Sequence, residues 1–177
     1  MLVYEDYLCE GEEVASDSYP PQEHDDKDIV LAIQGKMIAK GGETFDTGAN
    51  ASAEEAGEDL ADEIEQVCNV VDTHQLHKME FEKKEYKALQ KVYWKKLIAR
   101  FQEEKDAEAL ATLKKNFKRY QEWVKEEVLG NFDEFDFYVS EKAVLEDGCL
   151  IIPARWVGSA TAPLFYFIKS GLKEHKF

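Results

Sequence analysis

Cysteine is scarce in this sequence of 177 residues, and the three cysteines do not form a recognisable set. Cys9, Cys68 and Cys149 are odd in number, lie far apart and include no Cys-x-x-Cys pair. This pattern argues against a disulfide framework and is typical of reduced thiols in a cytoplasmic protein.

Long apolar runs are also missing. None approaches the ~20 residues that a membrane-spanning helix needs. The first residues carry neither the basic region nor the apolar region of a secretory signal. We therefore expect no membrane span and a cytoplasmic location. In that compartment the triplet Asn50-Ala51-Ser52, which fits the N-glycosylation pattern, is expected to stay unmodified.

Catalytic motifs are absent as well. Gly35-Lys36-Met37 lacks the earlier glycine and the following Ser or Thr of a phosphate-binding loop, so the chain is not expected to hydrolyse GTP. The cysteines lie in apolar or acidic surroundings, which raise a thiol pKa rather than lower it. No Ser/His/Asp set stands out, although spacing alone leaves open a triad assembled by folding. We predict that the protein is not an enzyme.

Acidic residues outnumber basic residues in this sequence. The chain has 37 acidic and 22 basic residues, for a net charge of −15. This excess argues against nucleic acid or an anionic membrane as the main partner. With 44% hydrophobic residues, the chain can bury a core, and we expect one domain over residues 1–177 and a monomer.

Residues 82–129 are predicted to form two amphipathic helices. The apolar positions that recur at three- and four-residue spacing are Tyr86, Leu89, Tyr93, Leu97 and Phe101, then Leu110, Leu113, Phe117, Tyr120, Val124 and Val128. Asp106 is suited to cap the second helix, and Gly130 is placed for a left-handed C-terminal residue. The short connection between the helices requires an antiparallel hairpin. Trp94 and Trp123 lie off the main stripes and could pack on a sheet or anchor a partner.

This helical hairpin carries most of the positive charge. It holds 13 basic and 9 acidic residues, a net charge of +4, which leaves −19 on the rest of the chain. The lysines along its two flanks are Lys84, Lys87, Lys91, Lys95, Lys114, Lys118 and Lys125. They could form a solvated face with intrahelical pairs, such as Glu122 with Lys118 and Lys125. Alternatively, because each helix of ~33 Å exceeds the ~8 Å screening length, the hairpin could bind an acidic protein surface such as tubulin.

The remaining segments favour strands. Residues 1–7, 64–81, 132–139 and 163–169 have β character, and residues 28–40 suggest a hairpin that turns at Gly35-Lys36. Pro153, after the apolar residues 149–152, suggests an edge strand or a bulge. After Ser170-Gly171-Leu172 we expect a charged tail. Since strands flank a helical insertion, we predict an α+β fold with a mainly antiparallel sheet.

Residues 41–62 are predicted to form a long mobile acidic loop, because they contain few apolar residues to offset the entropy of ordering. Its carboxylates include Glu54, Glu55, Glu58 and Asp59, with Asp62 beyond them. They could bind Ca²⁺ weakly, in roughly the millimolar range, or simply keep the chain soluble. Residues 25–28 lack the glycine and the closing glutamate of an EF-hand.

Histidines offer no better metal site. His74 and His77 are three apart, which on a strand places them on opposite faces, and no cysteine pair accompanies them. We interpret both as structural, and no cofactor is required.

Several motifs, in register along the whole chain, resemble the translationally controlled tumour protein family. They are Gly48-Ala49-Asn50-Ala51-Ser52-Ala53-Glu54-Glu55, Glu13-Val14-Ala15-Ser16-Asp17-Ser18-Tyr19, Phe137-Tyr138-Val139-Ser140-Glu141 followed by Asp147-Gly148, Phe81 to Tyr86, and Thr161-Ala162-Pro163 with Phe167 to Leu172. The sequence departs from the family at Ser140, where glycine is usual, at Ala162, which looks inserted, and at Glu82, which replaces the usual helix cap. The last change predicts a weaker helix N-terminus.

The resemblance implies a tent-like β-sheet with a projecting helical hairpin. It also implies a non-enzymatic cytoplasmic interaction protein linked to growth control, cell survival, calcium binding and microtubules. The position of Glu13 is tied in that family to a Ras-like small GTPase. We therefore expect Glu13, Asn50, Ser52 and Glu54 to contact such a partner. Fold relatives of the family carry zinc, which is not expected here.

Overall fold

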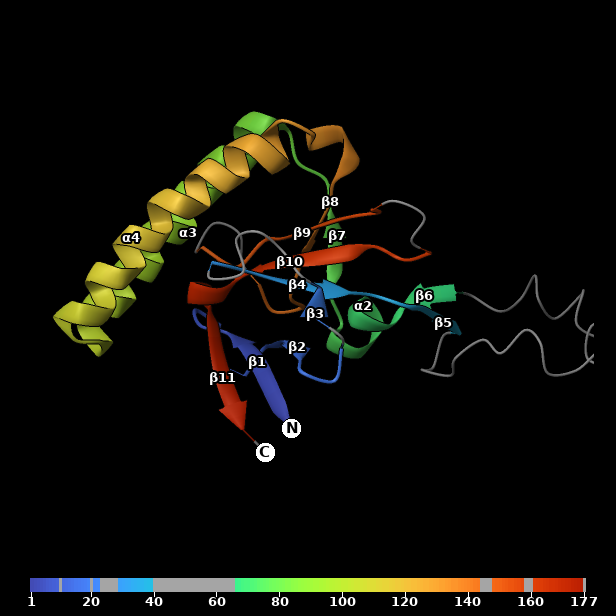
Figure 1. Ribbon diagram of the computed structural model, residues 1–177, viewed down its shortest axis with the longest axis horizontal. Coiled ribbons are helices and arrows are strands. Elements are labelled where there is room, and N and C mark those ends of the chain that lie inside the picture. Colours follow the sequence, from blue (N-terminus) through green and yellow to red (C-terminus); the bar gives the residue numbers. More distant parts are fainter. Residues whose placement is uncertain are drawn as a thin grey trace, which may run out of the picture.

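The computed structural model describes residues 1–9, 11–19, 21–22, 29–39, 66–143, 148–157 and 161–176. Antiparallel strands and two long helices make up most of this part of the chain, which confirms the predicted α+β class. In Figure 1 the helical hairpin lies on one side of the molecule, and the small sheet of β5 (Met37–Ala39) and β6 (Gln66–Cys68) lies at the opposite end. None of the helices in the described ranges combines the length and apolarity needed to cross a bilayer.

The strands form three sheets. The first has the order β11-β1-β2 and consists of Leu172–Lys176, Leu2–Asp6 and Glu13–Ser16. The second has the order β3-β4-β10-β9-β8-β7 and consists of Pro21–Gln22, Val30–Gln34, Leu164–Ile168, Ile152–Arg155, Asp136–Val139 and His77–Met79. The third pairs β5, Met37–Ala39, with β6, Gln66–Cys68. The expected charged tail is instead strand β11, which pairs with β1 from Leu2↔Lys176 to Asp6↔Leu172.

The hairpin predicted for residues 28–40 is wrong. Strand β4 pairs with β3 and β10, whereas β5 pairs with β6, so the chain passes from one sheet to another at Gly35. Glycine is needed there for close packing rather than for a turn. A Cβ on Gly35 would lie 2.6 Å from the Cys68 sulfur and 3.0 Å from the Phe165 ring.

A short helix, α2 at Asn69–His74, interrupts the β character predicted for residues 64–81. The Asn69 side chain accepts hydrogen bonds from the backbone N–H groups of Lys36 and Val70, at 2.8 and 2.9 Å. The helix also buries Val70 completely. Burial and the hydrogen bonds of Asn69 therefore override the β propensity of valine.

Pro153 lies in β9, between β8 and β10, so the expectation of an edge strand is wrong. Pro153 is opposite Phe137 of β8, while the pairs with β10 involve Ala154 and Arg155. The missing N–H of proline therefore falls outside the ladder with β10. Strand β8 is also shorter than predicted, because Phe132–Glu134 form a 3-10 turn before it.

The two predicted amphipathic helices are α3, Lys83–Glu104, and α4, Ala107–Trp123. The Asp106 carboxylate accepts a hydrogen bond from the N–H of Ala109 at 2.8 Å, as expected for an N-cap. Glu82 makes no such side-chain bond at the start of α3, in agreement with the weaker cap predicted there.

Gly130 is not left-handed, since its φ is −68°. After α4 the helix continues as a π-helical segment, Val124–Leu129, and the Asn131 side chain donates to the carbonyl of Glu127 at 3.0 Å. Glycine is needed at position 130 because there is no room for a side chain: a Cβ there would lie 2.5 Å from the Glu126 carbonyl oxygen.

Aromatic side chains join the helical hairpin to the second sheet. Trp123 packs on Tyr166 of β10 with ring centroids 5.3 Å apart, while Trp94 packs on Phe117 of α4 at 4.7 Å. Trp123 is thus a sheet-packing residue, and Trp94 belongs to the contact between the helices. Tyr93 is fully buried, and its hydroxyl lies against Gly171.

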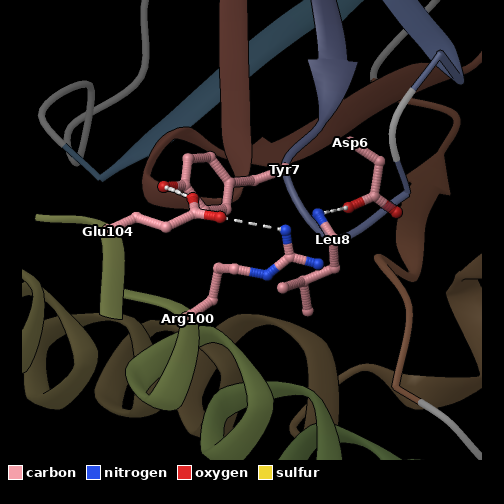
Figure 2. A network of polar contacts seen from close by, with 5 residues as sticks. All are labelled: Asp6, Tyr7, Leu8, Arg100 and Glu104. Carbon is pink, nitrogen blue, oxygen red and sulfur yellow. Dashed lines mark hydrogen bonds and ion pairs between the residues drawn. The ribbon is translucent and has the colours of Figure 1, made fainter. Parts of the chain in front are cut away.

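The end of α3 is tied to the loop after β1, although the hairpin extends beyond the sheets (Figure 1). Figure 2 shows the Tyr7 hydroxyl donating to Glu104, which also pairs with Arg100. These contacts measure 2.8 and 3.2 Å. Beside them, the buried Asp6 carboxylate accepts hydrogen bonds from the N–H groups of Leu8 and Leu150. The Tyr7 contact therefore holds the end of α3, while the packing of Trp123 on Tyr166 holds the end of α4.

Candidate partner-binding surfaces

Glu13 is exposed at the start of β2, on an otherwise buried strand. Its neighbours Val14 and Ala15 are completely buried, and Glu13 pairs with Glu5 across the sheet. A rigid strand therefore presents the carboxylate to solvent. We call the polar hollow of about 240 Å³ beside it the Glu13 pocket, which is lined by Gly11, Glu12, Glu13, Thr73, His74, Gln75, Glu141 and Lys142.

His74, at the end of α2, is one of the residues that line this pocket. Its Nε2 atom lies 3.2 Å from the Tyr19 hydroxyl, and its ring also bonds to the backbone carbonyl of Glu13. Burial lowers the pKa of His74 to about 4, and the Glu13 carbonyl only partly offsets this effect. The imidazole is neutral at pH 7, with one donor and one acceptor nitrogen for these two partners. It fixes the backbone that carries Glu13.

Two other residues that line the pocket form an ion pair. Lys142, after β8, forms an ion pair with the mostly buried Glu12 at 3.3 Å. Glu13 and Glu141 add two further carboxylates, so the pocket is acidic overall. Such a surface complements a basic or hydroxyl-bearing group on a partner.

Ser140 adjoins this pocket in sequence and replaces the glycine usual at that position. Gln75, with φ of 52°, is the one described non-glycine residue in the left-handed region. The backbone at Ser140 therefore does not require glycine.

The seven lysines predicted along the flanks of the helical hairpin are all exposed. Lys84, Lys87, Lys91 and Lys95 lie on α3, Lys114 and Lys118 lie on α4, and Lys125 lies in the segment Val124–Leu129. The expected pairs of Glu122 with Lys118 and Lys125 do not form among the described residues, whereas Arg100 pairs with Glu104, and Glu127 pairs with Arg155. Lys114, Lys115, Lys118 and Arg119 instead surround a shallow hollow on α4.

Comparison with known proteins decides the family. The family model described as "Translationally controlled tumour protein" matches residues 1–173. The chain belongs to the translationally controlled tumour protein family. It is 36% identical over 177 residues to the translationally-controlled tumor protein homolog of Gibberella zeae, with 99% of both chains covered. The homolog of Schizosaccharomyces pombe is 33% identical over 178 residues, and both chains are covered completely.

Solved structures of the translationally controlled tumour protein family agree with the fold. The Schizosaccharomyces pombe protein p23fyp superimposes with a TM-score of 0.72 and 34% identity, and both chains are covered completely. The solution structure of the Caenorhabditis elegans protein gives a TM-score of 0.64 and 29% identity, covering 100% of this chain and 99% of that one. The resemblance seen in the motifs is thus confirmed.

Part of the surface expected from the family lies outside the described residues. Asn50, Ser52 and Glu54 belong there, as do the calcium candidates Glu55, Glu58 and Asp59. Their roles stay predictions. Within the described ranges, no group of three or more His, Cys, Asp or Glu side chains is arranged to hold a metal ion. His74 ends a helix rather than lying on the expected strand, and His77 begins β7 with its side chain exposed.

The thiols of this family member are not activated. Burial raises the pKa of Cys149 to about 12 and, with the nearby Asp6 and Glu12 carboxylates, raises that of Cys9. Burial likewise raises the pKa of Cys68. A thiol with a raised pKa is a poor nucleophile at neutral pH, so the thiols supply no argument for covalent catalysis.

The sequence did not reveal the residues that surround Glu13. His74 and Lys142 lie 61 and 129 positions away in the chain, and neither belongs to a motif that points to Glu13. Only the pairing of the elements brings them to one pocket. The contact between Tyr7 and Glu104, which are 97 positions apart in the chain, could not be predicted from the sequence either.

Proposed function

We propose that this member of the translationally controlled tumour protein family is a non-enzymatic cytoplasmic regulatory protein that binds a Ras-like small GTPase through the Glu13 surface. The supporting observation is an exposed carboxylate on a buried strand, fixed by His74 and placed beside an acidic pocket. Glu13 accepts a hydrogen bond from a basic or hydroxyl group of the GTPase. Asn50, Ser52 and Glu54 complete the contact.

Replacing Glu13 tests this proposal. We expect Glu13→Ala to weaken binding of a fluorescently labelled Ras-like GTPase at least tenfold, because the partner's polar group loses its acceptor in a desolvated contact. The measurement is a titration followed by fluorescence anisotropy. Asp17→Ala is the matched control, since Asp17 is also exposed and acidic but does not line the Glu13 pocket. Superimposable curves for wild type and Glu13→Ala would exclude Glu13 from the contact.

A second candidate function uses the basic helical hairpin as a microtubule-binding surface. Its support is the set of exposed lysines on α3 and α4, which Glu122 does not neutralise. The acidic surface of tubulin is the complementary partner. Weak binding of Ca²⁺ at Glu54, Glu55, Glu58 and Asp59 accompanies this candidate, and no other cofactor is proposed.

Charge reversal tests the second candidate. We expect Lys87→Glu, Lys91→Glu and Lys95→Glu together to reduce co-sedimentation with microtubules at least tenfold at low salt, because three attractive contacts become repulsive. Wild-type binding should also fall steeply between about 50 and 300 mM salt. Changing Lys36, Lys169 and Lys176 to Glu is the control, since these exposed lysines give the same charge change away from the hairpin. Pelleting that ignores both salt and the α3 substitutions would contradict the candidate.

A further inference from the structure

A groove of about 280 Å³ follows the seam between α3 and α4. Its floor includes the rings of Trp94, Phe117 and Tyr120, with Trp94 centred 4.7 Å from Phe117 and 5.5 Å from Tyr120. On α3 it extends from Tyr86 to Trp94, a rise of roughly 12 Å or two helical turns. The groove is therefore shaped for side chains that project from a short segment, rather than for a large ligand.

Gln90 lies in this groove with its hydrogen-bonding capacity unused. The residue is only 8% exposed, yet neither its amide nitrogen nor its amide oxygen has a hydrogen-bond partner among the described residues. An unpaired buried amide costs free energy unless a partner is supplied from outside. Since Gln90 lines the groove, a carboxylate of a docked segment can accept a hydrogen bond from its amide nitrogen.

Positive charge lines the edges of the groove. Lys87, Lys91 and Lys125 belong to its lining, and none of the described residues that line it is acidic. All three lysines are exposed, so their ammonium groups are available to carboxylates. The same charge disfavours a second copy of this helical hairpin as the occupant, because it would bring lysines against lysines.

We infer that this groove binds an acidic amphipathic helical segment of a partner protein, whose apolar side chains enter the seam while its carboxylates meet Lys87, Lys91 and Lys125. This inference rests on the proposal that the basic hairpin binds an acidic protein. It adds that recognition requires apolar anchors as well as charge. Two or three anchors and exposed ion pairs give a modest affinity, with a dissociation constant in the range of tens of micromolar.

The probe is a fluorescein-labelled helical peptide of about 14 residues with Leu, Phe and Leu at positions i, i+4 and i+7 and glutamate elsewhere on its surface. A second peptide keeps every glutamate but replaces the three apolar residues by serine. Binding is followed by anisotropy and by the NMR signals of the tryptophan indoles. Trp94 lines the groove, whereas Trp156 is exposed after β9 and is the internal control. Trp123 stacks on Tyr120 of the groove floor and is not used as a control.

Two variants separate the groove from the charge of the hairpin. Gln121→Trp places a large ring over the groove from an exposed position and should weaken binding of the apolar peptide at least tenfold. Gln102→Trp is the same change at an exposed position of α3 outside the groove and should leave binding unaltered. Gln90→Met should weaken binding a few-fold while raising the denaturation midpoint, because it removes the unpaired amide. The weaker binding cannot then reflect unfolding.

The expected result is binding of the apolar peptide with a shift of the Trp94 signal and an unmoved Trp156 signal, lost in Gln121→Trp and retained in Gln102→Trp. Equal binding of the serine peptide, no binding, or an unmoved Trp94 signal would overturn the inference. A Trp94 shift that depends on protein concentration without peptide would assign the groove to a second copy. Displacement of the peptide by sub-millimolar decanoate would assign it to a small carboxylate. Either assignment overturns the peptide inference.

These tests remain distinct from the microtubule experiment. If the lysine reversals abolish pelleting while Gln121→Trp changes neither pelleting nor peptide binding, the groove inference fails and the charged surface stands. If the lysine reversals leave pelleting unchanged, the microtubule proposal fails. The peptide titration then decides the groove by itself.

Discussion

Gly171→Ala is expected to lower the free energy of unfolding by about 3 kcal/mol, because it forces a methyl group into a filled core. A Cβ at Gly171 would collide with the Tyr93 hydroxyl and lie 3.2 Å from the ring carbon that carries it. Tyr93 has no room to move, since it is fully buried between α3 and the body of the protein. A loss of this size corresponds to a fall in the melting temperature of roughly 6–12 °C for a chain of this length.

Tyr93→Phe should rescue this variant. Its hydroxyl has no hydrogen-bond partner among the described residues, so its removal alone should change stability little. In the double variant the colliding oxygen is gone, and at least half of the lost stability should return. Urea unfolding of the four proteins gives the coupling energy. Additive losses would mean that Gly171 and Tyr93 are not in contact, and that the hairpin is attached to the body in another way.

His74 should make the protein less stable as the pH falls from about 6.5 to 4. Its pKa is about 4 in the folded chain and about 6.5 in an unfolded one, so between these values the unfolded chain binds more protons. The stability supplied by the neutral imidazole is thus complete above pH 6.5 and is lost towards pH 4. By pH 4.5 the loss should reach about 2 kcal/mol, allowing for the partial exposure of the ring.

The measurement is urea unfolding at pH 7.5 and at pH 4.5. Many carboxylates also titrate in this interval, so the informative quantity is the difference between wild type and His74→Gln. This variant should lose about 2 kcal/mol less than wild type on acidification, because glutamine does not titrate. His77→Gln, the same change at an exposed histidine, should behave like wild type. Equal pH dependence in wild type and His74→Gln would show that the ring is not held neutral in the fold.

The helical hairpin was predictable from the sequence because helix periodicity and capping depend on residues that are close together in the chain. Apolar spacing placed Tyr86, Tyr93 and Leu97 on one face, and all three are buried. The capping residue Asp106 was also visible, since an N-cap depends on a hydrogen bond to a residue only three positions away.

Several glycines and valines were interpreted wrongly from local propensity, because close packing decides the structure at these positions. Gly35 and Gly130 had the appearance of turn or capping residues, but Cys68 and Phe165 approach Gly35 closely, and the Glu126 carbonyl, four residues earlier, approaches Gly130. Val70 and Val71 favour strands, yet they belong to α2, which begins at Asn69 and packs on β2. The close approach of Cys68 and Phe165 to Gly35 could not be predicted from the residues next to it in the sequence.

Some residues of the candidate surfaces could be predicted from the sequence, and others could not. The motif around Glu13 was visible because it follows the pattern of the family, and exposure of the hairpin lysines followed from helical periodicity. The pocket beside Glu13 and the groove at Gln90 depend on side chains brought together from separate elements. Such juxtapositions exist only after the chain has folded.

The pairing of β1 with β11 has a consequence for biosynthesis. Leu2 lies opposite Lys176, so β1 leaves the ribosome long before β11, the strand that covers one of its edges. Until then β1 can pair only with β2, and a lone two-stranded ribbon is marginally stable in water. The three-stranded sheet therefore closes after translation has passed residue 176, which makes it a late step in the maturation of the nascent chain.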